Sequence, residues 1–312
     1  MVGFYFGLLV FFLGSGHASH AAIWGADDRK ESYEYSPATV ERKTGRSVAM
    51  LVPWSRLVST PNGVTLNFLT YQQDSLLHEE RLCPRERFQN QPASIYSVGS
   101  GFLVAPQVLV TAGHVIPHEE ACRKRAVIFG VEWDPKANNI YPIPEQNVYG
   151  CDSILKSELQ ETPLIDYTVI RLNRPAFQIA PLPVRQHGII SSFARIAMAG
   201  HPFGLPLKIT GGGVMKENSE AFHFSAFLDT YPGNSGSPVI DAKTGLVEGV
   251  LVEGESSDIT LEGDWPEGCW YSKVYCDPKI PFSGICDTHE GMGAKVIRST
   301  VFAPVLKPEM VR

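Results

Sequence analysis

A serine set between glycines has the surroundings of a nucleophile. Ser235 lies in the run Gly233-Asn234-Ser235-Gly236-Ser237-Pro238, directly before an apolar stretch. A serine hydroxyl cleaves an acyl bond only when a base takes its proton and donors stabilise the oxyanion. The flanking glycines permit a sharp turn, so the backbone N–H groups of Gly233 and Ser235 would form an oxyanion hole. The alternative is an ordinary Gly/Ser turn between strands.

The base for this serine is expected to be His114, which ends the run Val110-Thr111-Ala112-Gly113-His114. An imidazole at a strand terminus can face a cleft, where it could take the proton of the serine. One alternative is a histidine satisfied by a backbone carbonyl. Another is a metal pair with His118, but Pro117 disfavours a helix between them and no Glu follows His114 as in a zinc-protease motif. We expect no metal.

Asp166 is the expected partner of the histidine. It leads into the apolar run Tyr167-Thr168-Val169-Ile170, where a carboxylate is costly to bury unless it is paired. Pairing with the Nδ1–H of His114 would satisfy it and hold the reactive tautomer. A solvent-exposed turn aspartate is the alternative, and Asp152 is the second candidate acid. The order His, Asp, Ser differs from that of α/β-hydrolases and of subtilisins.

Three segments together resemble the chymotrypsin-like (trypsin-fold) serine peptidases: Thr111-Ala112-Gly113-His114, Asp166-Tyr167-Thr168-Val169-Ile170-Arg171-Leu172, and Gly233-Asn234-Ser235-Gly236-Ser237-Pro238. The resemblance covers about residues 95–255. Within that group the chain looks most like the bacterial branch that includes the glutamyl endopeptidases, because of the Asn-Ser-Gly-Ser-Pro ending and the early Ile23-Trp24-Gly25-Ala26-Asp27-Asp28-Arg29. The resemblance implies two six-stranded antiparallel β-barrels with the triad His114, Asp166 and Ser235 in the cleft between them.

The chain also departs from the pattern of the animal enzymes. Residue 234 is Asn rather than the Asp that accepts a newly freed N-terminal amine, so that activation switch should be absent. Removal of a segment ending near Ile23 is the activation route that the glutamyl relatives suggest. Ser100 and Val115 stand where the vertebrate pattern has a cysteine pair, which leaves the histidine loop held by packing.

The resemblance also implies a set of substrate-binding residues: Asp229, Thr230, Leu251, Val252, Glu253 and Gly254. Asp229 occupies the place of the acid that binds a substrate Arg or Lys, although glutamyl enzymes also carry Asp-Thr there. Leu251 replaces the histidine that those enzymes use to neutralise a substrate Glu, so glutamyl specificity is not expected. Val252 to Gly254 should pair with extended substrate. Glu253 adds negative charge, which favours basic or neutral substrates.

The elements that must position these residues are short strands. Apolar, β-rich runs occupy 100–104, 108–111, 126–131, 141–151, 166–172, 194–200, 207–214, 221–228, 237–241 and 246–252. A Pro-rich passage, 175–183, separates two strand-rich halves, and 294–302 is expected to be a short C-terminal helix. The pattern predicts an all-β fold, as two small barrels or one sandwich, and the resemblance selects two six-stranded antiparallel barrels. We therefore expect an N-terminal arm at 23–45 and barrels at 46–178 and 179–312.

The composition and the N-terminal segment limit which binding partners and which cellular location we expect for this chain. The chain has 312 residues, 44% of them hydrophobic and 19% charged, with a net charge of −6 and no basic stripe, so nucleic acid is not an expected partner. Residues 1–22 contain an apolar stretch too short to span a bilayer and then small residues, which indicates a secretory signal peptide. A buried strand or an uncleaved anchor is the alternative. No later segment is apolar enough to cross a membrane.

All 6 cysteines follow that segment, which in an exported chain favours disulfides over a zinc site. Cys122 with Cys151 is the preferred pair, and a fully oxidised chain needs at least one bridge between the halves. The sequence thus predicts a secreted, monomeric serine endopeptidase that acts on polypeptides without a cofactor. A catalytically silent binding protein on the same fold is the alternative.

Overall fold

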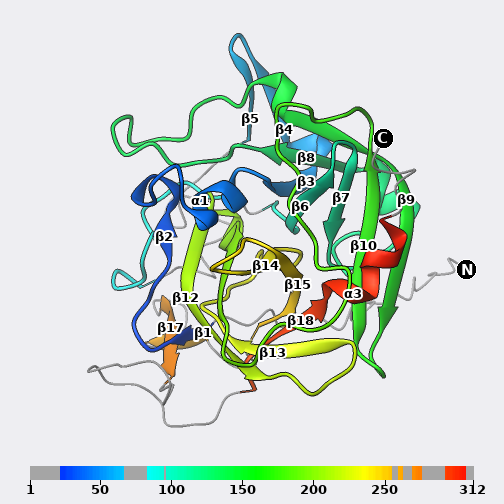
Figure 1. Cartoon of the computed structure of the whole chain (residues 1–312). Helices are drawn as coiled ribbons and strands as arrows, with labels where there is room; N and C mark the ends of the chain where they lie inside the picture. Colours follow the sequence, from blue (N-terminus) through cyan, green and yellow to red (C-terminus); the bar gives the residue numbers. More distant parts are fainter. Residues whose placement is uncertain are drawn as a thin grey trace, which may run out of the picture.

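Two closed β-barrels make up most of the structure, a computed structural model that describes residues 22–66, 83–94, 96–254, 259–262, 269–275 and 292–306 (Figure 1). The strands of the first barrel, in bonding order, are β10 (Ile165–Leu172), β7 (Val108–Thr111), β6 (Gly99–Ala105), β3 (Val48–Pro53), β8 (Arg125–Phe129) and β9 (Val148–Gln160). Neighbouring strands of this barrel are antiparallel.

The second barrel closes because the two ends of its strand order, β11 (Arg195–Gly200) and β12 (Lys208–Glu217), pair with each other. Its members, in bonding order, are β11, β14 (Pro238–Asp241), β15 (Val247–Glu253), β18 (Ala294–Arg298), β13 (His223–Phe227) and β12. A short strand from the N-terminal arm, β2 (Lys30–Glu31), adds to the outer edge of β12. The expected all-β fold of two six-stranded antiparallel barrels is confirmed.

The remaining elements are short. The other strands are β1 (Ala22–Trp24), β4 (Leu57–Thr60), β5 (Gly63–Leu66), β16 (Ile259–Glu262) and β17 (Cys269–Tyr275). The helices are α1 (Val40–Gly45), α2 (Glu119–Arg123) and α3 (Ser299–Phe302), with 3-10 turns η1 (Ser32–Glu34), η2 (Trp54–Arg56), η4 (Glu145–Asn147), η5 (Pro202–Gly204) and η6 (Ala303–Val305). Within the described residues, no helix is both long and apolar enough to cross a membrane.

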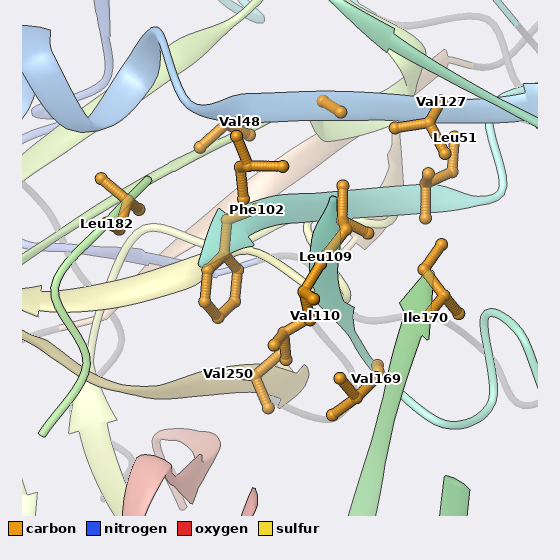
Figure 2. Packing of buried hydrophobic residues seen from close by; sticks show 14 of the residues in the cluster. Val48, Leu51, Phe102, Leu109, Val110, Val127, Val169, Ile170, Leu182 and Val250 are labelled. Carbon is orange, nitrogen blue, oxygen red and sulfur yellow. The ribbon is translucent and has the colours of Figure 1, made fainter. Parts of the chain in front are cut away.

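One continuous core joins the two barrels. Apolar side chains of β6 and β7, including Phe102 and Val110, pack with Val250 from β15 of the second barrel (Figure 2). Leu182, from the crossing between the barrels, lies in the same cluster. Each fully buried side chain of this kind contributes about 1.5–3 kcal/mol. The barrels are therefore held against each other by the same apolar packing that fills the first barrel.

The prediction of a C-terminal helix over 294–302 is wrong for the first half of that range. Residues Ala294–Arg298 form β18, and the helix is only Ser299–Phe302. Ala294, Val296 and Ile297 are fully buried, because β18 lies between β13 and β15 in the second barrel. Tertiary pairing decides this segment, since a short apolar run fits a buried strand as well as a helix.

The N-terminal arm is integrated into the second half of the molecule rather than merely extended. Its first strand, β1, pairs in parallel with β17, and its second, β2, pairs with β12. Arg29 and Glu31 are 2% and 3% exposed, and both are paired: Arg29 with Glu86 at 3.0 Å and Glu31 with Lys208 at 3.1 Å. The arm thus pairs with β12, which precedes the nucleophile candidate in the chain, and with β17, which follows it. Residues 1–21 of the expected signal segment lie outside the described residues.

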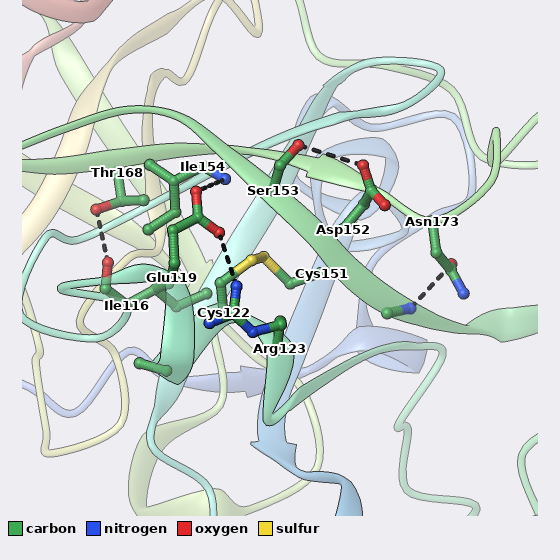
Figure 3. The surroundings of a disulfide bond; sticks show 12 residues. Ile116, Glu119, Cys122, Arg123, Cys151, Asp152, Ser153, Ile154, Thr168 and Asn173 are labelled. Atoms are coloured by element: carbon green, nitrogen blue, oxygen red, sulfur yellow. Dashed lines mark hydrogen bonds and ion pairs between the residues drawn. A yellow bond between two sulfur atoms is a disulfide. The ribbon is translucent and has the colours of Figure 1, made fainter.

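Two disulfides lie within the described residues. Cys122 bonds to Cys151, which confirms the preferred pair and ties α2 to β9 (Figure 3). Cys83 bonds to Cys269 and so provides the expected bridge between the halves of the chain. Cys276 and Cys286 lie outside the described residues.

Candidate active site

The histidine and aspartate candidates meet where β7 of the first barrel ends and the adjacent strand β10 begins. Strand β7 pairs with β10 so that Thr111 lies opposite Thr168, which brings the loop after β7 to the beginning of β10. His114 Nδ1 lies 2.6 Å from Asp166 Oδ2, and the His114 main-chain N–H donates to Asp166 Oδ1 at 3.0 Å. One carboxylate therefore holds both the ring and the backbone of the histidine.

The surroundings of this pair favour a fixed geometry. The Asp166 side chain is 9% exposed and that of His114 is 41% exposed, so the acid is shielded while the imidazole faces solvent. A Cβ on Gly113 would lie 2.8 Å from Asp166 Oδ1 and 2.9 Å from the Glu158 carbonyl oxygen, which explains glycine at that position. With Nδ1–H donated to the carboxylate, the free Nε2 is the ring's basic nitrogen.

The serine candidate lies on the other barrel, in the turn between β13 and β14. Its main-chain oxygen accepts a hydrogen bond from Ser100 N in β6 at 2.8 Å, which docks the turn on the first barrel. A Cβ on Gly99 would lie 2.9 Å from the Ser235 oxygen and 2.8 Å from Val115, so the serine turn and the histidine loop meet at this glycine. Neither Ser235 nor His114, both described, donates a hydrogen bond to the other; such contacts often tighten only when substrate binds.

Two peptide planes before Ser235 are held from outside the turn. The Pro232 carbonyl accepts from Phe203 N at 2.5 Å, and the Gly233 carbonyl accepts from Ser100 Oγ at 2.8 Å. Because the C=O and N–H of one peptide point in opposite directions, the first contact turns the Gly233 N–H away from Phe203. Neither Gly233 N–H nor Ser235 N–H has an acceptor among the described residues.

The loop that supports this turn is unusual in its backbone. Phe203 has φ 51°, in the left-handed region that disfavours residues with a side chain, and Gly233 has φ 92° with the place of a Cβ only 2.5 Å from the His201 oxygen. His201 is 1% exposed, and its main-chain N–H donates to Ser100 Oγ at 3.0 Å. Burial lowers the pKa of His201 to about 4, so its ring is neutral.

Sequence reasoning missed the positions that support this turn. The sequence pattern marks Ser100 only as the place of an absent cysteine, and it does not indicate Phe203 or His201. The flanking glycines Gly99 and Gly101 in an otherwise apolar strand were the available signal, since glycines there permit close backbone approach. Nothing local indicates Phe203, whose contact with Pro232 joins two distant loops.

Of the substrate-binding candidates, Asp229 is bound within the protein. Asp229 Oδ1 accepts from Trp24 N at 2.8 Å and Oδ2 accepts from Asp28 N at 2.9 Å. The side chain is buried, and burial, followed by the nearby charge of Asp28, raises the pKa of Asp229 well above its usual range. Asp28 in turn accepts a short hydrogen bond from Gly212 N, and burial raises its pKa as well.

The other five candidates lie along β15 and beside Asp229. Leu251 is 2% exposed within the core of the second barrel, and its main chain bonds to Gly236 and Ser237. Thr230 and Val252 are buried, whereas Glu253 is half-buried and pairs with Lys295 at 2.9 Å. Gly254, also half-buried, directly follows the strand. Roles of the six residues toward substrate stay predictions.

The alternatives for the histidine region can also be placed. His118 does not face His114 as a second ligand but caps α2, with Nδ1 accepting from Ala121 N at 3.2 Å. The described residues contain no group of three or more potential metal ligands. Asp152, the second candidate acid, is exposed beside the disulfide, and its carboxylate accepts from the hydroxyl of Ser153 (Figure 3).

Comparison with known proteins identifies a peptidase domain in this chain. Residues 99–250 match the family model of the trypsin-like peptidase domain. Among solved structures, a human heparin binding protein is 10% identical with a TM-score of 0.50, and the match covers 89% of this chain and 93% of that protein. At this identity the likeness concerns the fold alone. No curated protein sequence matches the chain.

Two peptidases are among the other structural matches. A Glu endopeptidase in complex with MPD is 14% identical with a TM-score of 0.49, covering 93% of this chain and 100% of that one. The VesB protease of Vibrio cholerae is 11% identical with a TM-score of 0.49, covering 91% and 67%. Neither match bears on the choice of substrate. With the family match over residues 99–250 and the two-barrel fold around it, the chain contains a trypsin-like peptidase domain.

Proposed function

We propose that this chain is a secreted endopeptidase that cleaves peptide bonds through an acyl-enzyme, with Ser235 as nucleophile, His114 as base and Asp166 as the group that orients the base. The observation that carries the proposal is the double contact of Asp166 with His114, at 2.6 Å to the ring and 3.0 Å to the main chain. A carboxylate bound to Nδ1–H keeps Nε2 unprotonated and stabilises the imidazolium that forms during the reaction.

The reaction follows from these groups. Ser235 Oγ attacks the scissile carbonyl carbon while His114 Nε2 takes the hydroxyl proton. The proton then passes to the leaving amine, the C–N bond breaks, and the acyl group remains on Ser235. Water, deprotonated by His114, releases the acid in the second half of the cycle. The Gly233 and Ser235 N–H groups, which have no acceptor among the described residues, are the proposed oxyanion donors.

The proposed substrate preference narrows the expectation of basic or neutral side chains to neutral ones. The expectation of basic substrates depends on the carboxylates of Asp229 and Glu253, and both already have partners within the protein. Asp229 accepts hydrogen bonds from two main-chain N–H groups, and Glu253 pairs with Lys295. Asp229 is also buried with a raised pKa, which disfavours a free negative charge. We therefore propose that the side chain before the scissile bond is neutral, and that Val252 to Gly254 pair with the extended substrate backbone.

Secretion is the second part of the proposal. It is supported by the apolar N-terminal stretch and by the two disulfides, since such bonds persist in oxidising compartments. N-terminal sequencing of protein recovered outside the producing cell should place the mature terminus at residues 19–23. A terminus far from that range would contradict the signal-peptide prediction.

The catalytic part is tested by single substitutions. Ser235→Ala should abolish cleavage of casein and of fluorogenic peptides while leaving the fold intact by circular dichroism. His114→Ala should reduce the rate by a similar factor, because the triad members act as a unit. Cleavage by Ser235→Ala at the wild-type rate would contradict the assignment. No cleavage by the wild type would favour the silent binding protein.

A further inference from the structure

A hollow of 310 Å³ opens beside the candidate catalytic histidine. It lies between the histidine loop, α2 and the beginning of β8, and its lining includes His114, His118, Glu120, Lys124 and Arg125. Because the exposed ring of His114 forms part of its wall, a substrate chain positioned for attack at Ser235 passes close to it. The hollow therefore belongs to the substrate path rather than to a remote surface.

The walls of this hollow are fixed by contacts outside it. The Cys122–Cys151 disulfide ties α2 to β9, and Glu119 accepts from Ile154 N at 2.9 Å (Figure 3). Thr168 Oγ1 donates to the Ile116 carbonyl at 2.9 Å and so holds the histidine loop against β10. A side chain that projects from this frame is held in place before substrate binds, which reduces the entropy cost of binding.

The charges that line the hollow leave one cation unpaired. Lys124 is paired with Glu120 at 2.5 Å, and His118 accepts a hydrogen bond from the backbone of α2. Arg125, the first residue of β8, has no ion pair among the described residues, and its Nε is buried without a hydrogen-bond partner. Burial lowers the pKa of this guanidinium, with no anion acting in the opposite direction.

An unpaired, partly buried guanidinium calls for an anion of matching geometry. Removing a charge from water costs free energy unless a partner replaces the lost solvation. A carboxylate fits the guanidinium fork with two parallel hydrogen bonds, and such charge-assisted pairs are stronger than neutral ones. A peptide substrate offers a carboxylate on an Asp or Glu side chain and at its C-terminus.

We propose that Arg125 makes this hollow a subsite for a substrate carboxylate, so that the enzyme prefers peptides with an acidic group near the scissile bond. The inference rests on the proposed peptidase function and concerns a position other than the one beside Asp229. It gives the enzyme a selectivity that the neutral primary site does not supply.

The test compares acidic peptides with their amide analogues in each variant. Quenched fluorescent peptides carry Asp or Glu, or the isosteric Asn or Gln, at each position on either side of the cleaved bond. A second set keeps a neutral sequence and ends in either a free carboxylate or an amide. The ratio of kcat/KM for acid over amide is the readout, since a general loss of activity cancels in it.

We expect the wild type to favour one acidic position by about 10- to 100-fold, the size of a charge-assisted hydrogen bond. Arg125→Gln should bring that ratio close to one, and Arg125→Lys should retain part of it. Arg123→Gln is the matched control, because Arg123 is an exposed neighbour on α2 that pairs with Glu119 at 3.8 Å. It should keep the wild-type ratio.

The two peptide sets separate the two sources of the carboxylate. A preference confined to the first set indicates an acidic side chain, and one confined to the second indicates the substrate C-terminus. Wild-type enzyme that cleaves neutral peptides with no carboxylate preference, or an unchanged ratio in Arg125→Gln, overturns this inference alone. Absence of both cleavage and fluorophosphonate labelling in the wild type overturns the proposed function as well.

Discussion

The hydroxyl of Ser100 offers a sharp test of how the oxyanion turn is held. Ser100 Oγ donates to the Gly233 carbonyl at 2.8 Å and accepts from His201 N at 3.0 Å, so Ser100→Ala leaves two polar groups without a partner. Each unsatisfied buried group costs about 1–3 kcal/mol. The Gly233 carbonyl belongs to the Gly233–Asn234 peptide, which lies between the two peptides that carry the proposed oxyanion donors, Gly233 N–H and Ser235 N–H. Part of this cost is relieved if that peptide rotates, and its rotation would displace the neighbouring donors.

The expected loss of kcat in Ser100→Ala is no larger than the loss caused by removing one oxyanion donor completely. Complete loss of one oxyanion donor reduces kcat by about 10²- to 10³-fold. Because Phe203 still holds the preceding peptide, we expect a partial loss in Ser100→Ala, about 10- to 100-fold in kcat with KM little changed. A contact made only in the transition state lowers kcat in this way.

The assay pairs Ser100→Ala with Ser47→Ala. Ser47 is also buried, at 1% exposed, and its hydroxyl donates to the Ala180 carbonyl at 2.6 Å, away from the nucleophile turn. Kinetics use a fluorogenic peptide, and urea unfolding is measured in a Ser235→Ala background to prevent autolysis. Ser47→Ala should lose about 1–3 kcal/mol of stability and no kcat. A kcat for Ser100→Ala within twofold of the wild type, with reduced stability, would refute the positioning role.

Three further substitutions test other parts of the account. Asp166→Asn should lower kcat by about 10⁴-fold without unfolding the protein, because the acceptor for His114 Nδ1–H is lost; a loss below tenfold would contradict its role. Asp28→Asn should raise the urea midpoint of unfolding at pH 8 more than at pH 4. Burial raises the pKa values of Asp28 and Asp229, so the folded state binds protons more tightly than the unfolded state and loses stability as the pH rises above 3.8. The substitution removes one of the two carboxylates that cause this loss. An equal shift at both pH values would oppose that reasoning. Gly236→Ala should destabilise by about 2 kcal/mol or more, since φ is 88° and the Cβ would lie 2.0 Å from a main-chain oxygen of β6, and an unchanged melting temperature would contradict it.

Local pattern was sufficient for most of the barrel strands. The run 108–111 coincides with β7, and 166–172 differs from β10 by one residue, because β-branched and apolar residues in short runs leave little choice. The pairing of Cys122 with Cys151 was also accessible, since both cysteines flank strands of the same half. The expected strand at 141–151 overlaps β9, Val148–Gln160, only at its end.

The arm and the support of the nucleophile turn were not accessible in the same way. Charged residues such as Arg29 and Lys208 would ordinarily be placed on the surface, and their burial depends on partners far away in the sequence. Asp229 shows the same limit: its position before Ser235 suggested substrate recognition, yet its oxygens bind the N–H groups of Trp24 and Asp28. Only the folded chain brings these groups together.

These contacts connect the arm to the site. Arg29 lies over the Tyr231 ring at 4.0 Å, and Tyr231 OH donates to Glu86 at 3.2 Å. Ile23 packs against the same tyrosine, which precedes Ser235 by four residues. The segment that begins where the signal peptide is expected to end therefore contacts the nucleophile turn directly, and processing near Ile23 would act on that contact.

The central claim is that Ser235 is the nucleophile activated by His114 and Asp166, and labelling tests it most directly. Wild-type protein is treated with a fluorophosphonate and digested, and the modified residue is located by mass spectrometry. We predict one adduct per chain, on Ser235, with none in Ser235→Ala and strongly slowed labelling in His114→Ala. An adduct on another residue, or labelling of Ser235→Ala at the wild-type rate, would contradict it.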